Sequence, residues 1–263
     1  MGLLEGKKAL VIGVANKRSI AWGIAQAFAR EGAELGFTYQ PDPRLRENVK
    51  ELVATLPGAD GIPVLPCDVS SDEQIAALFA ELGERWGKLD VLVHSVAFAP
   101  IDELRGRFVQ VSRKGLLDAI SISAYSLHAV VRAAVPLFEA AGGGSAMSMT
   151  FNSVERVVPS YNAMAMAKAV LEAETRYLAA DLGPQNIRVN TISAGPLKTL
   201  AASAVKGISQ ARDLMEAKSP LRRNVTQEEI GNVAAFLASD WSRTITGATI
   251  FADNGMNIVG VTD

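Results

Sequence analysis

The chain has 263 residues, of which 49% are hydrophobic and 21% charged, with a formal net charge of −2 at pH 7; this length allows one large core, and we expect a single domain over residues 1–263. The sequence has no Lys/Arg run that would bind nucleic acid, no disulfide partner for its one cysteine, Cys67, and no spacing typical of metal ligands. It shows no cleavable signal layout and no apolar stretch of about 18 residues, so we expect a cytoplasmic protein that binds no nucleic acid, membrane or metal.

The first predicted elements are a strand over residues 8–12 and a helix that ends at Arg30, joined by a turn that begins at Gly13. A strand, a glycine turn and a helix start form a phosphate-binding arrangement, because free N–H groups and the positive end of the helix dipole face the turn. Ser19 follows Gly13 after five residues, so it can cap the helix and donate to a pyrophosphate oxygen. An ordinary turn capped by Ser19 fits the same pattern.

The second and third predicted strands, residues 34–39 and 62–66, end at positions that would face an adenosine. Gln40 follows the second strand, where an acidic residue suits a free 2′-hydroxyl and basic residues suit a 2′-phosphate. Gln40 is neutral, and Arg44 and Arg46 lie in a segment that also reads as a solvated helix start, so the pattern favours NADH and leaves NADPH possible. Asp68 follows the third strand as either an acceptor for the adenine amino group or a turn residue.

A helix over 75–86 and a fourth strand over 90–94 come next, and small residues at 95–100 would let a cofactor approach the backbone. We interpret His94 as a packed residue at the strand end rather than a catalyst. Residues 112–139 read as one long helix that is buried on more than one side and could also contact another subunit.

A fifth strand over 145–151 and a loop over 152–160 precede a helix over 161–182 that carries Tyr161 and Lys168. Seven residues span about two turns of a helix, so both side chains would leave the same face. A lysine ammonium near a phenol lowers the phenol pKa from about 10, which would make Tyr161 a proton donor near neutrality. The alternative is an ordinary amphipathic helix with a tyrosine at its start and an exposed lysine.

The last predicted elements are a sixth strand over 188–193, a helix that starts at the capping box of Thr226 and Glu229 and runs to Ala238, and a seventh strand over 247–252. Between them, a poorly periodic segment at about 197–221 is either a cover over a substrate pocket or a surface loop with a short helix. Strands that alternate with helices predict an α/β fold with a doubly wound parallel sheet of seven strands, whose ligands bind at the carboxyl ends of the strands.

Four segments together resemble one family: Gly13 with residues 19–21, residues 94–100, residues 156–161 with Lys168, and residues 188–202. They are similar in nearly full length and order to bacterial enoyl-[acyl-carrier-protein] reductases, a divergent branch of the short-chain dehydrogenase/reductase superfamily. The resemblance implies a Rossmann-type subunit that assembles as a homotetramer. It also implies reduction of the trans-2 double bond of an enoyl thioester on acyl carrier protein in fatty-acid elongation, with NADH or NADPH as the cofactor.

The resemblance assigns roles position by position. Tyr161 would donate its hydroxyl to the thioester carbonyl, Lys168 would bind the nicotinamide ribose, and Ala99 would line the substrate entrance. The positions implied to bind the cofactor are Gly13, Ser19, Ile20, Gln40, Asp68, Val69, Val96, Lys168, Leu197, Lys198, Thr199, Leu200 and Ala201.

Phe151 departs from the family pattern, because a second tyrosine usually stands ten residues before Tyr161. Ordinary short-chain dehydrogenases place their tyrosine four residues before the lysine, where this chain has Met164, and Ser148 could be misread as the serine of their catalytic set. Phe151, and Asn254 where the family favours a glycine, keep open a related reductase for another activated alkene or carbonyl. A third alternative is a nucleotide-responsive binding protein without catalysis, against which the intact Tyr161 and Lys168 pair argues.

Overall fold

Seven parallel strands form one sheet in the order β3-β2-β1-β4-β5-β6-β7 within the residues that the computed structural model describes, 2–199, 202 and 207–260. The strands are β1 (Lys8–Ile12), β2 (Glu34–Tyr39), β3 (Val64–Pro66), β4 (Val91–His94), β5 (Gly144–Thr150), β6 (Ile187–Ala194) and β7 (Thr249–Ala252). The predicted doubly wound α/β sheet is therefore confirmed. The third strand begins at Val64 rather than at residue 62, because pairing with β2 starts where Phe37 meets Val64.

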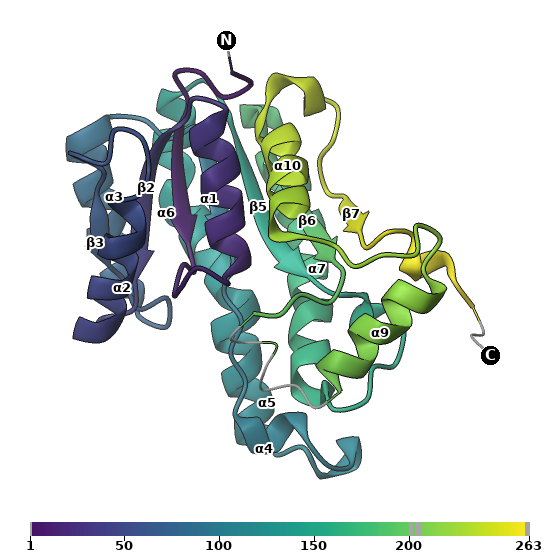
Figure 1. Ribbon diagram of the computed structural model, residues 1–263. Helices are drawn as coiled ribbons and strands as arrows, with labels where there is room; N and C mark the ends of the chain where they lie inside the picture. Colours follow the sequence, from purple (N-terminus) through teal and green to yellow (C-terminus); the bar gives the residue numbers. More distant parts are fainter. Residues whose placement is uncertain (1, 200–201, 203–206, 261–263) are drawn as a thin grey trace.

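Helices cover both faces of the sheet (Figure 1). One face carries α1 (Ile20–Arg30), α2 (Pro43–Val53) and α10 (Gln227–Ala238), and the other carries α3 (Asp72–Trp86), α6 (Ser126–Ala140) and α7 (Asn162–Leu182). The helices α4 (Ile101–Leu104), α5 (Arg113–Ile120) and α9 (Ile208–Lys218) extend beyond the carboxyl ends of the strands. These three helices therefore surround the space beyond the carboxyl ends of the strands, where a ligand of such a sheet would bind.

Strand β1 shows why the central strands read as continuous apolar runs. Its alternate side chains enter two separate cores: Ala9 and Val11 pack with α1 and α10, and Leu10 and Ile12 pack with α3 and α6. A parallel strand with helices on both faces has no solvent side, so polar alternation is absent.

The long helix expected over 112–139 is a continuous helical run, Arg113–Ala140, with one π-helical turn at Ser121–Tyr125 between α5 and α6. Ser123 in this turn donates its hydroxyl to Phe98 O at 2.8 Å and accepts Phe98 N–H at 2.8 Å. By length and composition alone the run could cross a membrane, but it packs against α3 and α7 as a core helix does.

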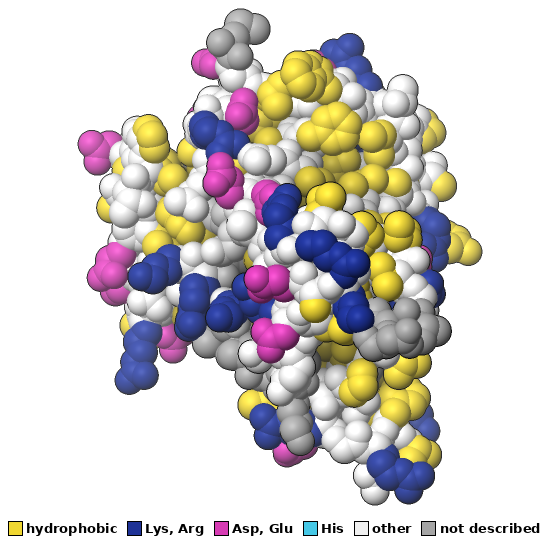
Figure 2. Space-filling model, turned by 45° about the vertical axis from the view of Figure 1, so that its right-hand side comes forward, with side chains coloured by type: hydrophobic (Ala, Val, Ile, Leu, Met, Phe, Trp, Pro, Cys, Tyr) yellow, Lys and Arg dark blue, Asp and Glu magenta, His cyan; other side chains and the backbone are white. Residues whose placement is uncertain are grey.

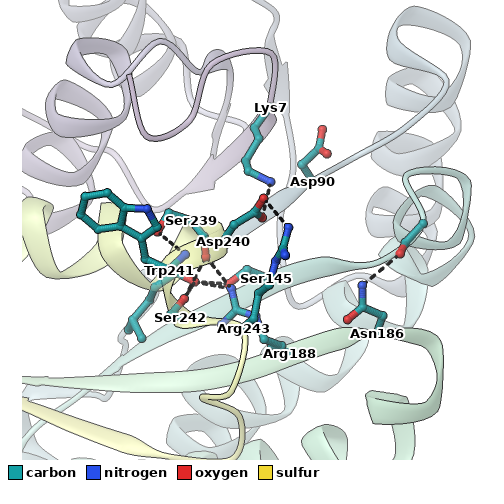
Figure 3. Close-up of polar contacts among 12 residues, drawn as sticks. Lys7, Asp90, Ser145, Asn186, Arg188, Ser239, Asp240, Trp241, Ser242 and Arg243 are labelled. Atoms are coloured by element: carbon teal, nitrogen blue, oxygen red, sulfur yellow. Dashed lines mark hydrogen bonds and ion pairs between the residues drawn. The ribbon is translucent and has the colours of Figure 1, made fainter. Parts of the chain in front are cut away.

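At the amino ends of the strands, Arg188 links β6 to the end of α10 and the residues that follow it (Figure 3). From the start of β6, its guanidinium donates to Leu237 O at 2.6 Å and to Ile245 O at 3.1 Å. Ser145, at the start of β5, donates to the same Leu237 carbonyl at 2.8 Å. These donors satisfy the Leu237 carbonyl, which lacks a helical partner near the end of α10, and the Ile245 carbonyl in the segment before β7. At its start, α10 has the predicted capping box of Thr226 and Glu229.

Candidate active site

Gly13 follows β1 and lies directly against the loop that follows β4. Its φ is +108°, and a Cβ atom built there would sit 2.1 Å from Ser95 O, so only glycine fits. The loops after two neighbouring strands are thus in contact, and together they line the carboxyl end of the sheet beside the start of α1. A glycine in the tight turn after the first strand is a feature of dinucleotide-binding folds.

Ser19 organises the glycine turn but does not cap α1, so that part of the expectation is wrong. It occupies the position before Ile20, yet its Oγ accepts N–H groups of the turn itself, from Ala15 at 3.1 Å and Asn16 at 3.2 Å. These N–H groups fold back onto the hydroxyl and take the oxygen that would otherwise cap the helix. The hydroxyl hydrogen remains to donate to an anion.

A cavity of about 560 Å³ lies at the carboxyl ends of β2 and β3, where the sequence placed Gln40 and Asp68. Its lining consists of Gln40, Pro41, Asp42, Arg44, Leu45, Asn48, Asp68 and Gln74. Asp68 lines this cavity and also holds a turn, because its Oδ1 accepts the N–H of Ser70 at 2.9 Å and its hydroxyl at 2.7 Å. Cys67, just before it, is buried, and desolvation together with Asp68 raises the pKa of its thiol to about 11.

Phe151 and Tyr161 lie together beyond the end of β5, and Lys168 reaches the loop that follows β4. The ring centroids of Phe151 and Tyr161 are 5.4 Å apart with the ring planes tilted by 53°. Lys168 is only 3% exposed, and its Nζ donates to Val96 O at 3.3 Å. The exposed lysine of the alternative interpretation is therefore excluded.

The expectation that Lys168 lowers the pKa of Tyr161 is wrong. Helix α7 begins at Asn162, so Tyr161 precedes it with φ −117° and does not lie on the helix face that carries Lys168. Desolvation instead raises the Tyr161 pKa above its ordinary value near 10. Burial lowers the pKa of Lys168 to about 8, against a smaller opposing effect of Glu172. At neutral pH the site holds a protonated phenol and a lysine ammonium.

His94 is a packed histidine, as interpreted from the sequence. It is fully buried, and burial, with a smaller contribution from Lys168, lowers its pKa to about 3. Its Nε2 lies 2.7 Å from Ser126 Oγ, and that hydroxyl donates to Ile122 O at 2.6 Å. With its hydrogen already used, Ser126 can only accept from His94, so the ring is neutral with its proton on Nε2.

The remaining predicted positions divide among core, surface and the undescribed part of the chain. Ala99 and Tyr161 pack against the same small cluster, which includes Leu104 and Met164, so the proposed substrate entrance and proton donor share one apolar wall. Leu197 is buried in the first core and Lys198 is exposed. Leu200 and Ala201 lie outside the described residues. The other predicted cofactor positions are found at strand ends or the start of α1: Ile20, Val69 and Thr199.

Sequence reasoning missed Glu172, a carboxyl group one helical turn beyond Lys168. Its exposure is 9%, it accepts a hydrogen bond from Thr150 Oγ1 at 2.6 Å, and burial is the main cause that raises its pKa. The four-residue spacing from Lys168 on one helix was the signal that could have found it.

A doubly wound parallel sheet, with a glycine turn after its first strand and a tyrosine and a buried lysine at its carboxyl end, defines a dinucleotide-dependent oxidoreductase. The family model described as enoyl-(acyl carrier protein) reductase matches residues 13–257. The enoyl-[acyl-carrier-protein] reductase [NADH] of Nostoc sp. is 51% identical over 260 residues, 98% of this chain and 99% of that protein. The chain therefore belongs to the enoyl-(acyl carrier protein) reductase family.

Two solved structures show how far the fold is shared. The Bacillus cereus enoyl-acyl carrier protein reductase, crystallised with NADP+ and indole naphthyridinone, superimposes with a TM-score of 0.96 at 48% identity, over 99% of this chain and all of that one. The Anaplasma phagocytophilum reductase in complex with NAD gives 0.93 at 42% identity, over 100% of this chain and 98% of that one. Members of the family have thus been crystallised with either nucleotide.

Proposed function

We propose that the chain reduces the trans-2 double bond of enoyl thioesters on acyl carrier protein with NADH, in fatty-acid elongation. One observation carries the proposal: Tyr161 and the buried Lys168 both stand at the carboxyl end of the sheet, in a chain of the enoyl-(acyl carrier protein) reductase family. NADPH remains a possible cofactor.

The residues at the strand ends fit a nicotinamide dinucleotide. The turn at Gly13 and the hydroxyl of Ser19 would hold the pyrophosphate, the cavity at Gln40 would take the adenosine, and Lys168 would bind the nicotinamide ribose hydroxyls. When bound, NADH supplies the hydride that adds to the β-carbon of the substrate. Lys168 already holds its ammonium toward Val96 O at 3.3 Å, so the group is fixed before a ribose arrives.

Tyr161 would act as the hydrogen-bond and proton donor to the substrate. Its phenol is neutral at physiological pH because desolvation raises its pKa, so it enters the reaction as a hydrogen-bond donor to the thioester carbonyl. Addition of hydride at the β-carbon moves negative charge to that carbonyl oxygen, and the phenol stabilises the resulting enolate. The phenol proton would then pass to the enolate oxygen, and the enol would tautomerise to the saturated thioester with its new proton on the α-carbon. Solvent would return a proton to the phenolate.

The test is loss of the reduced-nicotinamide absorbance when purified chain is mixed with crotonyl and longer trans-2-enoyl thioesters, with NADH and NADPH in parallel. We expect turnover with NADH. Measurable NADH binding without turnover of any enoyl thioester would instead identify a binding protein. Faster turnover of another activated alkene or a ketone would identify the related reductase that Phe151 and Asn254 keep open.

Asn254 itself fits its place in the fold. Its φ is +56°, in the left-handed region that glycine favours and asparagine tolerates, and its Nδ2 donates to Arg223 O at 2.7 Å. The left-handed backbone at this position therefore explains why an asparagine can stand where the family favours a glycine.

Phe151→Tyr is expected to change kcat or the preference among acyl chain lengths by about threefold to tenfold, the effect of about one hydrogen bond. The Phe151 ring packs on Tyr161 with centroids 5.4 Å apart, so a hydroxyl added there would lie close to the proposed carbonyl site. Steady-state kinetics with short and long enoyl thioesters measure the effect. Phe151→Leu controls for loss of the ring, and a tyrosine variant identical to the parent would show that the position only packs.

We also propose a cytoplasmic homotetramer, as the family resemblance implies. Figure 2 shows hydrophobic side chains gathered on the upper part of one face of the molecule. Leu117 on α5 is also 57% exposed, and burial of apolar surface by another subunit would stabilise an assembly. Light scattering of the purified protein measures the assembly, and a monomeric mass at micromolar concentration would contradict it.

A further inference from the structure

The charged side chains that line the cavity at the ends of β2 and β3 bear on the choice between NADH and NADPH. In the proposed function it receives the adenosine ribose, whose 2′ position is a hydroxyl in NADH and a phosphate in NADPH. Among the described residues that line it, the charged side chains are Asp42, Arg44 and Asp68. Two carboxylates therefore oppose one guanidinium at the place where the two nucleotides differ.

Asp42 occupies the start of helix α2 with its own carboxylate. Its Oδ1 accepts the N–H of Arg44 at 2.8 Å and the N–H of Leu45 at 3.1 Å. Pro43, the first residue of the helix, has no N–H to offer. The donors with which a helix start commonly binds a phosphate are therefore already used by an anion that belongs to the chain.

The two nucleotides would meet this arrangement differently. A 2′-phosphate carries between one and two negative charges near neutrality and mostly accepts hydrogen bonds, so it would be repelled by the carboxylate of Asp42. A 2′-hydroxyl can donate to a carboxylate at no electrostatic cost. Arg44 attracts a phosphate, but its guanidinium lines the same cavity as both carboxylates.

We propose that Asp42 is a specificity-determining residue, which selects NADH over NADPH by filling the anion-binding start of α2 with a fixed carboxylate. The inference rests on the proposed function, since it concerns the cofactor of that same site. Family membership alone does not decide the matter, because the B. cereus relative was solved with NADP+ and the A. phagocytophilum relative with NAD.

The experiment is calorimetric titration of the purified full chain with NADH and with NADPH, in the absence of enoyl thioester. Asp42→Asn removes the charge and keeps a capping oxygen, so the Kd for NADPH is expected to fall about tenfold while the Kd for NADH stays within about twofold. Asp42→Gly also frees the N–H groups of Arg44 and Leu45, at little cost to the helix, and is expected to favour NADPH further.

Glu51→Gln is the matched control. It removes one exposed carboxylate from the same helix, nine residues and about 13 Å farther along, beyond the screening length of about 8 to 10 Å at physiological salt. Its NADPH to NADH affinity ratio is expected to equal that of the parent. The gain in Asp42→Asn is expected to shrink as salt is raised, because an electrostatic effect is screened.

An unchanged affinity ratio in Asp42→Asn overturns the inference, and so does equal weakening of both nucleotides, which would assign to Asp42 only the folding of the helix start. Either result leaves the proposed function intact as long as NADH binds and supports enoyl reduction. A parent chain that binds neither nucleotide would overturn both proposals together.

Discussion

Tyr161→Phe is expected to lower kcat for a trans-2-enoyl thioester by about 10² to 10³, the usual loss when one donor to a developing oxyanion is removed. The substitution deletes only the hydroxyl, so the ring contact with Phe151 and the packing beside Ala99 remain. Because catalysis and not binding is affected, the KM for substrate and the Kd for NADH are expected to change little. Stopped-flow measurement of the first turnover separates the chemical step from product release.

The control is Tyr177→Phe, which removes a hydroxyl from a tyrosine that is 80% exposed on α7. Its rate is expected to match that of the parent. If Tyr161→Phe retained more than about a tenth of the parental rate, the donor role would be wrong, and the search would move to other groups near the Phe151 ring.

Lys168→Met is expected to weaken NADH binding at least tenfold and to lower turnover with it, because a charge-assisted hydrogen bond to a ribose hydroxyl contributes about 1.5 to 3 kcal/mol. Methionine fills a similar volume and suits a site that is 3% exposed, so the fold is expected to survive. Calorimetry gives the affinity and initial rates give the turnover. Unchanged NADH affinity would contradict the anchoring role.

Lys168→Met is also expected to change how the stability of the protein depends on pH, because the buried lysine titrates. Burial lowers the lysine pKa from 10.5 to about 8, so between these values the unfolded chain binds more protons than the folded one, and stability rises with pH. Below pH 8 both states are charged and the full cost of burying the ammonium is present. Lys168→Met is therefore expected to be more stable than the parent at pH 7, by a margin that closes toward pH 10 in thermal melts.

The sequence predicted the sheet well because burial on both faces leaves a readable mark. Strands β1 and β4 are continuous apolar runs, and glycine or polar residues interrupt the pattern where each strand ends. The π-helical turn at Ser121–Tyr125 was not predictable, since one extra residue in a turn barely changes the hydrophobic pattern of a helix. The roles of residues 197–221 as a substrate cover remain a prediction.

At the site, sequence reasoning predicted which residues gather but not how they interact. Tyr161 and Lys168 are both at the carboxyl end of the sheet, as the strand order requires. The raised pKa of Tyr161 depends on desolvation by segments far apart in the chain, and no spacing rule contains that information. The same is true of Ser19, whose oxygen is taken by its own turn.

The burial of Cys67 makes the chain a convenient host for chemical probes. With its thiol pKa raised to about 11, only about one molecule in ten thousand carries the reactive thiolate at pH 7, and that thiolate is sealed inside the protein. Maleimide dyes or spin labels would therefore react with a cysteine introduced at the surface and pass over the native one. Movements of helix α9 could then be followed by fluorescence in the otherwise unaltered enzyme.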